Sequence, residues 1–166
     1  MKVGKLSPRE EEARIKAARE AIGPDVQLML DANNAWNDLP TALTYMERYE
    51  PYSPYWIEEP FSPDEVDLHA RLAERTPVIV ATGEIGYGRW YHQELLSKGA
   101  AAILQTDALV CGGITEWKRI AATAAVREQS THKRELVFLL GVDAMAYGGP
   151  LPPRRGMHTA CSRPPV

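Results

Sequence analysis

A chain of 166 residues, of which 45% are hydrophobic and 25% are charged, has the composition of a globular protein that buries one core. Its formal net charge of −3, with lysines and arginines dispersed along the chain, argues against nucleic-acid binding. No apolar run approaches the roughly 20 residues that span a bilayer, and no apolar signal region follows the N-terminus, so we expect a cytoplasmic protein without membrane association.

The first predicted helix begins with a capping box, in which a serine and a glutamate three residues later satisfy each other's backbone N–H groups. This local sequence is Ser7-Pro8-Arg9-Glu10, with proline at the first helical position, and the helix should end before Gly23-Pro24. Its buried face should carry Ile15, Ala18 and Ile22, which follow helical spacing.

A second capping box, Ser62-Pro63-Asp64-Glu65, predicts another helix start. Val66, Ala70 and Ala73 should form the buried stripe of the helix that follows. Apolar residues at helical spacing predict three more helices, over residues 38–49, 89–98 and 115 to about 128.

Between the predicted helices lie apolar runs that read as strands, each followed by an acidic residue. The runs and their acids are 26–30 with Asp31, 55–57 with Glu58, 78–83 with Glu84, and 101–106 with Asp107. The acids recur about every 25 residues, the length of one strand, one helix and two short loops in a repeating βα unit. Because the runs show little polar alternation, they predict parallel strands that are buried on both faces.

Two architectures satisfy this order of elements, an open doubly wound sheet and a (β/α) barrel. Acids at the ends of four successive strands favour the barrel, which carries its catalytic side chains there. We therefore predict an α/β fold in which residues 1–140 form a partial TIM-barrel-type domain of about five or six βα units. Residues 141–166 are rich in Gly, Pro and Arg and predict an irregular or disordered tail.

Parallel strands would bring the four carboxylates to one rim of the sheet, where each pair 4 Å apart repels by about 4 kcal/mol at an effective dielectric of 20. Either their pKa values rise and they take up protons, or a hard divalent cation lies among them. Oxygen ligands without neighbouring His or Cys favour Mg²⁺ or Mn²⁺ over zinc. Taken singly, each acid is explained as a solvated loop residue or a helix cap, whereas four in phase favour one site.

Four motifs surround these acids: Asp31-Ala32-Asn33, Trp56-Ile57-Glu58-Glu59-Pro60, Thr82-Gly83-Glu84, and Gln105-Thr106-Asp107 followed by Gly112-Gly113-Ile114-Thr115. Together their order, spacing and strand positions resemble the enolase superfamily, in its mandelate racemase branch, over about residues 2–125. The resemblance implies that Asp31, Glu58 and Glu84 bind Mg²⁺. Glu59 should have a structural role, because adjacent residues of a strand face opposite sides.

The resemblance also implies a reaction, the Mg²⁺-dependent removal of the proton next to a carboxylate. This step develops an enediolate, whose second negative charge a divalent ion stabilises. In this branch the reaction leads to racemisation or dehydration of hydroxy acids and sugar acids. We expect a small carboxylate or sugar-acid substrate, with sugar-acid dehydration as the leading reaction.

Lys2-Val3-Gly4 resembles the second half of the family's K-x-K-x-G motif, which makes Lys2 a candidate general base. Burial and a nearby cation would lower its pKa toward neutrality, whereas the alternative is a solvated lysine at a frayed terminus. Asp107 matches the acid that orients a catalytic histidine on the next strand. His132 has the spacing of that histidine but lacks an apolar strand before it, and it is also explained as a solvated helix end.

Three further polar residues have separate assignments. Asn33 should point to the same rim and contact substrate, unless it serves only as a turn residue. His69 and His92 fall within predicted helices, and we expect them at the surface.

The length of the chain supports a hypothesis of another class. A full barrel domain has about 250 residues, so the alternative to an active enzyme is a truncated barrel that keeps its metal ligands without turnover. An incomplete barrel exposes two sheet edges and apolar helix faces. We therefore expect self-association into a homo-oligomer, or recruitment of a partner.

Overall fold

The protein is built on a parallel five-stranded sheet whose spatial order, β1-β2-β3-β4-β5, is the order of the strands along the chain. The structure, a computed structural model, describes residues 1–131 and 137–138. The strands are β1 (Met29–Asp31), β2 (Trp56–Glu58), β3 (Ile79–Thr82), β4 (Ile103–Leu104) and β5 (Val137–Phe138). A doubly wound sheet would reverse its strand order at a switch point, so the sequential order confirms part of a (β/α) barrel.

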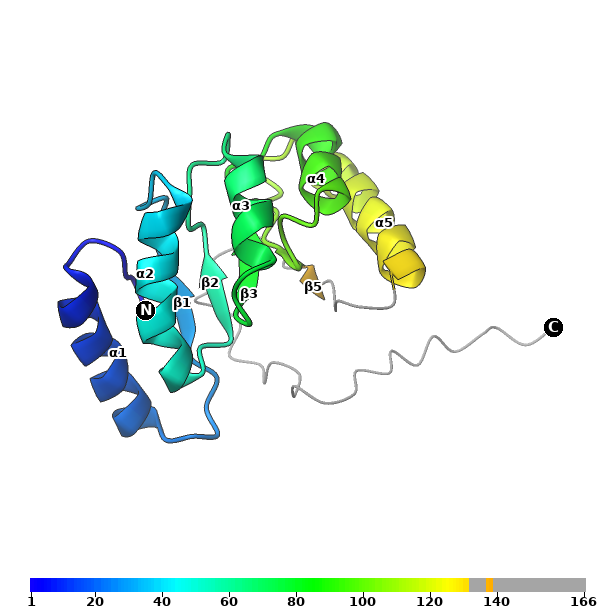
Figure 1. The fold of residues 1–166 in the computed structure, drawn as a ribbon. Coiled ribbons are helices and arrows are strands. Elements are labelled where there is room, and N and C mark those ends of the chain that lie inside the picture. Colours follow the sequence, from blue (N-terminus) through cyan, green and yellow to red (C-terminus); the bar gives the residue numbers. More distant parts are fainter. Residues whose placement is uncertain (132–136, 139–166) are drawn as a thin grey trace.

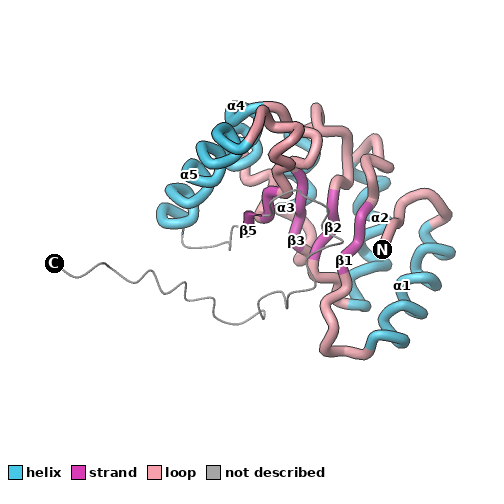
Figure 2. The backbone as a smooth tube through the Cα atoms, turned by 180° about the vertical axis from the view of Figure 1, so that it is seen from behind, coloured by secondary structure: helices cyan, strands magenta, loops and turns pink. Residues whose placement is uncertain are grey.

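One helix at least separates each pair of successive strands. The helices are α1 (Pro8–Ile22), α2 (Leu39–Tyr49), the 3₁₀ helix η1 (Glu50–Tyr52), α3 (Val66–Ala73), α4 (Gly88–Ser97) and α5 (Ile114–Thr131). Figure 1 shows α2 and α3 in front of the strands, and Figure 2, seen from behind, shows the strands in front of these helices. Helices thus cover one face of the sheet, as in a barrel wall. Among the described residues, no helix is long and apolar enough to cross a membrane.

Residues 1–3 extend the sheet beyond β1. Lys2 forms an isolated parallel bridge with Asp31, the Val3 N–H donates to the Asp31 carbonyl at 2.8 Å, and the Asp31 N–H donates to the Met1 carbonyl at 3.0 Å. The chain therefore begins as a sixth parallel segment. Its carboxyl end lies beside that of β1.

The capping box at the start of α1 is confirmed. The Ser7 side chain accepts from the Glu10 N–H, and the Glu10 carboxylate accepts from the Ser7 N–H at 3.0 Å. Ile15 is buried as predicted, but Ile22 is 37% exposed. Glu11, in the first turn of the helix, is also buried, and its carboxylate accepts hydrogen bonds from the backbone of residues 5 and 6 and from Arg14.

The second predicted capping box is wrong. Residues 62–65 form a turn, in which the Glu65 N–H donates to the Ser62 carbonyl at 2.9 Å, and α3 begins only at Val66 without a side-chain cap. Phe61, directly before the turn, is fully buried and fixes the chain there. Val66 and Ala73 are buried as predicted, with Ala70 partly buried beside them.

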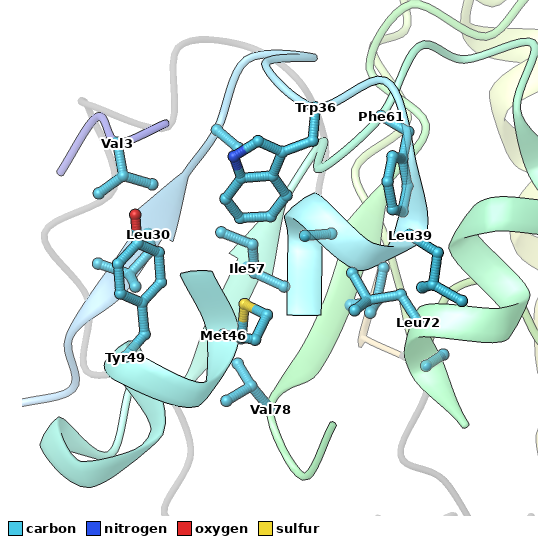
Figure 3. Close-up of a cluster of buried hydrophobic side chains, with 14 of the residues drawn as sticks. Val3, Leu30, Trp36, Leu39, Met46, Tyr49, Ile57, Phe61, Leu72 and Val78 are labelled. Carbon is cyan, nitrogen blue, oxygen red and sulfur yellow. The ribbon is translucent and has the colours of Figure 1, made fainter. Parts of the chain in front are cut away.

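The main hydrophobic core lies between the sheet and the helices (Figure 3). From the sheet it receives Leu30, Ile57 and Val80, which are register partners on three neighbouring strands. From the helices it receives Ile15, Met46, Tyr49 and Leu72, among others. These strand residues alternate with Met29, Trp56 and Ile79, which pack on the opposite face.

This alternation decides where the first two acids point. Asp31 and Glu58 each follow a helix-facing residue, so their side chains share the face of Met29 and Trp56. That face corresponds to the interior of a barrel. The strand β5 pairs with β4, whereas the predicted tail of residues 141–166 lies outside the described residues.

Candidate functional site

Predicted site residues lie at the carboxyl ends of four neighbouring parallel segments. Asp31 and Glu58 end β1 and β2 and are direct register partners, and Lys2 is the partner of Asp31 on the other side. Glu84 follows β3 after Gly83, whose φ of +120° is readily adopted only by glycine. The structure therefore brings Lys2, Asp31 and Glu58 to one level of the sheet, with Glu84 on the turn that follows the next strand.

The carboxylates are close enough to influence one another. Burial raises the pKa of Glu58, and the charges of Asp31 and Glu84 raise it further. A hydrogen bond from the Gln105 side chain and the charge of Lys2 act in the opposite direction. Such opposing effects on the pKa of Glu58 are expected where several carboxylates lie near one another and a proton or a cation would stabilise them.

Lys2 joins two of the predicted site residues. Its ammonium forms an ion pair with the Asp31 carboxylate and donates to Asn33 Oδ1 at 3.2 Å. The expected lowering of the Lys2 pKa is not what this structure shows, because the hydrogen bond to Asp31 raises the pKa. The Lys2 side chain is 68% exposed, so burial opposes this effect only weakly.

Asn33 closes the turn after β1. Its backbone N–H donates to Asp31 Oδ1 at 2.9 Å, and its φ of +51° is in the left-handed region that asparagine tolerates. The turn role is thereby observed. Contact with a substrate stays a prediction, supported by the position of the Asn33 side chain beside Lys2.

Glu59 is a fourth carboxyl group near the rim, and its structural role stays a prediction, although the strand alternation on which that prediction rested does not hold here. β2 ends at Glu58, and Glu59 has a φ of +42°, so the alternation of strand side chains does not apply to it. It is buried, and burial together with the charges of Glu84, Glu58 and Asp31 raises its pKa to about 7. In the sequence, two adjacent acids at the end of a strand, Glu58 and Glu59, already indicated that Glu59 lies close to the other carboxylates.

Asp107 lies in the loop after β4. Its Oδ1 accepts from the Leu109 N–H at 2.7 Å, and its carbonyl accepts from the Cys111 N–H at 2.8 Å, so it helps to shape that loop. His132, which has the spacing of a histidine partner but no apolar strand before it, lies outside the described residues. The histidine partner of Asp107 therefore stays unassigned.

Both helical histidines are buried, contrary to the expectation that they lie at the surface. His92 Nδ1 lies 2.8 Å from the Gly88 carbonyl oxygen and Nε2 lies 3.2 Å from that of Gly83. His69 Nδ1 lies 2.9 Å from the Glu65 carbonyl oxygen, and its ring packs edge-on against Phe61. Burial lowers the pKa of both imidazoles. Backbone carbonyls supply the polar partners that make this burial tolerable.

The oxygens of Asp31, Glu58 and Glu84 suit Mg²⁺ or Mn²⁺, and the charges of Asp31 and Glu84 add to the burial that raises the pKa of Glu58. Within residues 1–131 and 137–138, however, no three His, Cys, Asp or Glu side chains converge into a group that would hold a metal ion in this conformation. Repulsion among the carboxylates and the ion pair of Asp31 with Lys2 both oppose convergence before a cation binds. The three carboxylates thus provide the oxygen ligands that Mg²⁺ or Mn²⁺ prefers.

A hollow of about 410 Å³ lies away from this rim, beside the segments that lead into β1 and β2. Its one arginine, Arg19, already donates to backbone carbonyls on both segments. These are the carbonyls of Gly23, Val26, Tyr52 and Ser53, at 2.6 to 3.1 Å. The hollow is therefore lined by a structural clamp, and we place the functional site at the acidic rim.

Comparison with known proteins finds sugar-acid dehydratases and cycloisomerases among the similar sequences. The chain is 42% identical over 118 residues to D-galactarolactone cycloisomerase of Agrobacterium fabrum, which covers 70% of this chain and 31% of that protein. It is 40% identical over 126 residues to arabinonate dehydratase of Saccharolobus solfataricus, which covers 76% of this chain and 34% of that protein. The chain thus spans about a third of the length of these curated relatives.

Solved structures agree with these relatives. A 3,6-anhydro-D-galactonate cycloisomerase from Zobellia galactanivorans matches with a TM-score of 0.75 and 35% identity, covering 83% of this chain and 37% of that one. L-Talarate dehydratase from a Polaromonas species, complexed with Mg and L-glucarate, matches with a TM-score of 0.73 and 33% identity, covering 82% and 43%.

The family model described as Enolase C-terminal domain-like matches residues 1–156. This match extends over most of the chain and includes all four acidic motifs. Together with the sequential parallel sheet and the relatives above, it shows that this chain belongs to the enolase C-terminal domain-like family.

Proposed function

We propose that this chain carries the metal-binding part of an enzyme that removes the proton α to the carboxylate of a sugar acid, leading to dehydration. The observation that carries the proposal is the register of Lys2, Asp31 and Glu58, which sets a candidate base beside two candidate Mg²⁺ ligands. The relatives support the substrate class, since they include dehydratases of arabinonate and of L-talarate and galactarate.

Each site residue has a distinct role in this proposal. Asp31, Glu58 and Glu84 would hold Mg²⁺, which when bound supplies positive charge to an enediolate. Lys2, in its neutral form, would accept the α-proton at Nζ. Asn33 would hydrogen-bond a hydroxyl group of the substrate from its place beside Lys2.

The state of Lys2 is linked to that of the carboxylates. In this structure Asp31, Glu58 and Glu84 all favour the charged ammonium of Lys2. A base must first lose that proton, so neutralisation of the carboxylates is a condition for catalysis. The site is therefore expected to use Lys2 as a base only when its acids are ligated.

A second candidate is a metal-binding chain that self-associates without turnover. It is favoured by exposed apolar side chains on the two loops that precede α4 and α5, where Tyr87 is 77% exposed and Leu109 is 87% exposed. Large exposed apolar side chains on neighbouring loops are typical of interaction surfaces. This candidate predicts a molar mass that rises with protein concentration in sedimentation equilibrium.

The metal site is tested by thermal unfolding with and without Mg²⁺. A ligand at ten times its Kd adds about 1.4 kcal/mol to the free energy of unfolding, which raises Tm by about 4 °C in a chain of this size. We expect this rise in the wild type and in the exposed control Glu47→Gln, and its loss in Glu58→Gln. If millimolar Mg²⁺ does not change the Tm of the wild type, the proposed metal site is wrong.

The reaction is tested by exchange of the α-proton of a panel of sugar acids in D₂O, followed by NMR. Mg²⁺-dependent exchange that disappears in Lys2→Met supports the proposed enzyme. Bound metal without exchange across the panel favours the second candidate.

A further inference from the structure

His92 is a buried side chain of α4 that touches both ends of the turn carrying Glu84. Its imidazole is fully buried. Nε2 lies 3.2 Å from the carbonyl oxygen of Gly83, the residue directly before Glu84, and Nδ1 lies 2.8 Å from that of Gly88, where α4 begins. One ring therefore joins the peptide that precedes a predicted metal ligand to the helix that follows it.

The turn backbone lies directly on this ring. A Cβ added at Gly83 would lie 3.4 Å from His92 Nε2, and one added at Gly86 would lie 3.0 Å from His92 Cε1. The Gly83 carbonyl also accepts from the Gly86 N–H at 3.1 Å, which closes the turn. The glycines thus allow a close approach that side chains would prevent.

Glu84 itself is exposed, so packing does not fix its side chain. The direction in which its carboxylate reaches depends on the peptide that it follows. The Gly83 peptide is held by the turn and by His92. A fixed peptide at this point narrows the range of positions that the carboxylate can reach.

We propose that His92 is a positioning residue, whose Nε2–H group donates to the Gly83 carbonyl and thereby aims Glu84 at the metal site. The inference rests on the proposed Mg²⁺ site. Both contacts of the ring are to carbonyl oxygens, which only accept, and a neutral imidazole carries a single N–H. The proposal therefore requires the tautomer with the proton on Nε2, in which Nδ1 faces the Gly88 carbonyl oxygen at 2.8 Å without a hydrogen bond.

Two substitutions test the two ring contacts one at a time, because each places an amide nitrogen at the position of one ring nitrogen. The side-chain amide of glutamine reaches the position of Nε2, and that of asparagine reaches the position of Nδ1. His92→Gln should therefore keep the contact to Gly83, and His92→Asn should keep only the contact to Gly88. His92→Phe keeps the ring and loses both.

Mn²⁺ affinity, measured from the EPR signal of free Mn²⁺, gives the readout, with metal-free Tm recorded for each variant. We expect His92→Gln to bind Mn²⁺ like the wild type, and His92→Asn and His92→Phe to bind about tenfold more weakly, the usual size for a group that orients a ligand. A role in stability alone would instead lower Tm and leave the affinities equal.

His69 is the matched control. It is equally buried on the preceding helix and makes the same kind of Nδ1 contact, to Glu65, but it does not touch the Glu84 turn through any hydrogen bond that the described structure contains. His69→Gln and His69→Asn should lower Tm without changing Mn²⁺ affinity. Equal affinities for the two His92 amide variants would overturn the proposal.

A measurement on the wild type needs no variant to fold. The ¹⁵N shifts of the His92 ring distinguish the two neutral tautomers, and the proposal requires a proton on Nε2. A proton on Nδ1 overturns it while leaving the metal site intact. A wild type that binds no Mn²⁺ overturns the proposed function as well.

Discussion

Lys2 and Asp31 are joined twice, as register partners in the sheet and as an ion pair between their side chains. The candidate base therefore already contacts a candidate metal ligand. A cation that binds Asp31 must share or displace the ammonium of Lys2. The two functions of the rim, holding metal and moving a proton, meet at this one carboxylate.

Replacement of Lys2 by methionine should separate these functions. Lys2→Met removes a positive charge that competes for Asp31, so the affinity for Mg²⁺ should rise about threefold, the size of one exposed ion pair. Exchange of the α-proton should fall at least about 100-fold with the loss of the base. Lys5→Met, which removes an exposed lysine nearby, should change neither quantity. An unchanged Mg²⁺ affinity in Lys2→Met would contradict the competition.

Glu59 should destabilise the metal-free protein at neutral pH. Its pKa is raised to about 7, so the folded chain holds a proton that the unfolded chain releases above about pH 4.5. Stability from this group is present at low pH and is lost as the pH rises toward 7. Glu59→Gln, which imitates the protonated form, should be more stable than the wild type by about 3 kcal/mol at pH 8. The difference should vanish near pH 4.5 in urea titrations.

His69 should have the opposite dependence on pH. Burial lowers its pKa, so below about pH 6.5 the unfolded chain takes up a proton that the folded chain resists. Stability from this group is complete above that pH and falls by up to about 1.4 kcal/mol per pH unit as the pH drops. His69→Gln should lose less stability than the wild type between pH 7 and pH 5. Parallel losses in the two proteins would show that His69 does not titrate this way.

Gly4 should be more sensitive to substitution than another glycine of similar backbone conformation. Gly4 has a φ of +90°, and a Cβ there would lie 2.6 Å from the Cβ of Ala35, whereas Gly99 has a φ of +65° and open space around it. Gly99→Ala should cost about 1 kcal/mol for the backbone alone, and Gly4→Ala about 3 kcal/mol because it adds a clash. Urea unfolding of both variants measures the difference. Similar costs would mean that residues 1–4 shift to relieve the contact.

The elements that the sequence predicted correctly are those that local rules specify. The capping box at Ser7 and the apolar runs that became β1 to β4 depend on few neighbours. The same local sequence at Ser62 failed, because the burial of Phe61 places a turn there first. At this position, tertiary packing of Phe61 therefore overrides the local preference of Ser62 for a helix N-cap.

The candidate site was predictable to a similar extent. Asp31 and Glu58 are register partners because each directly follows the apolar residues of its strand and the two strands are parallel. The burial of His92 was not predictable, since its partners are carbonyl oxygens outside any residue pattern. The strand alternation did not extend to Glu59, because β2 ends at Glu58 and the backbone of Glu59 is left-handed.

The sequential order of the strands has a consequence for how the site forms during synthesis. Each described strand after β1 pairs with the one made just before it, so none of these pairings waits for a distant part of the chain. The segments that carry Lys2, Asp31, Glu58 and Glu84 all precede β4 in the chain. On the ribosome, the rim is expected to assemble unit by unit from the N-terminus, before the later strands have emerged.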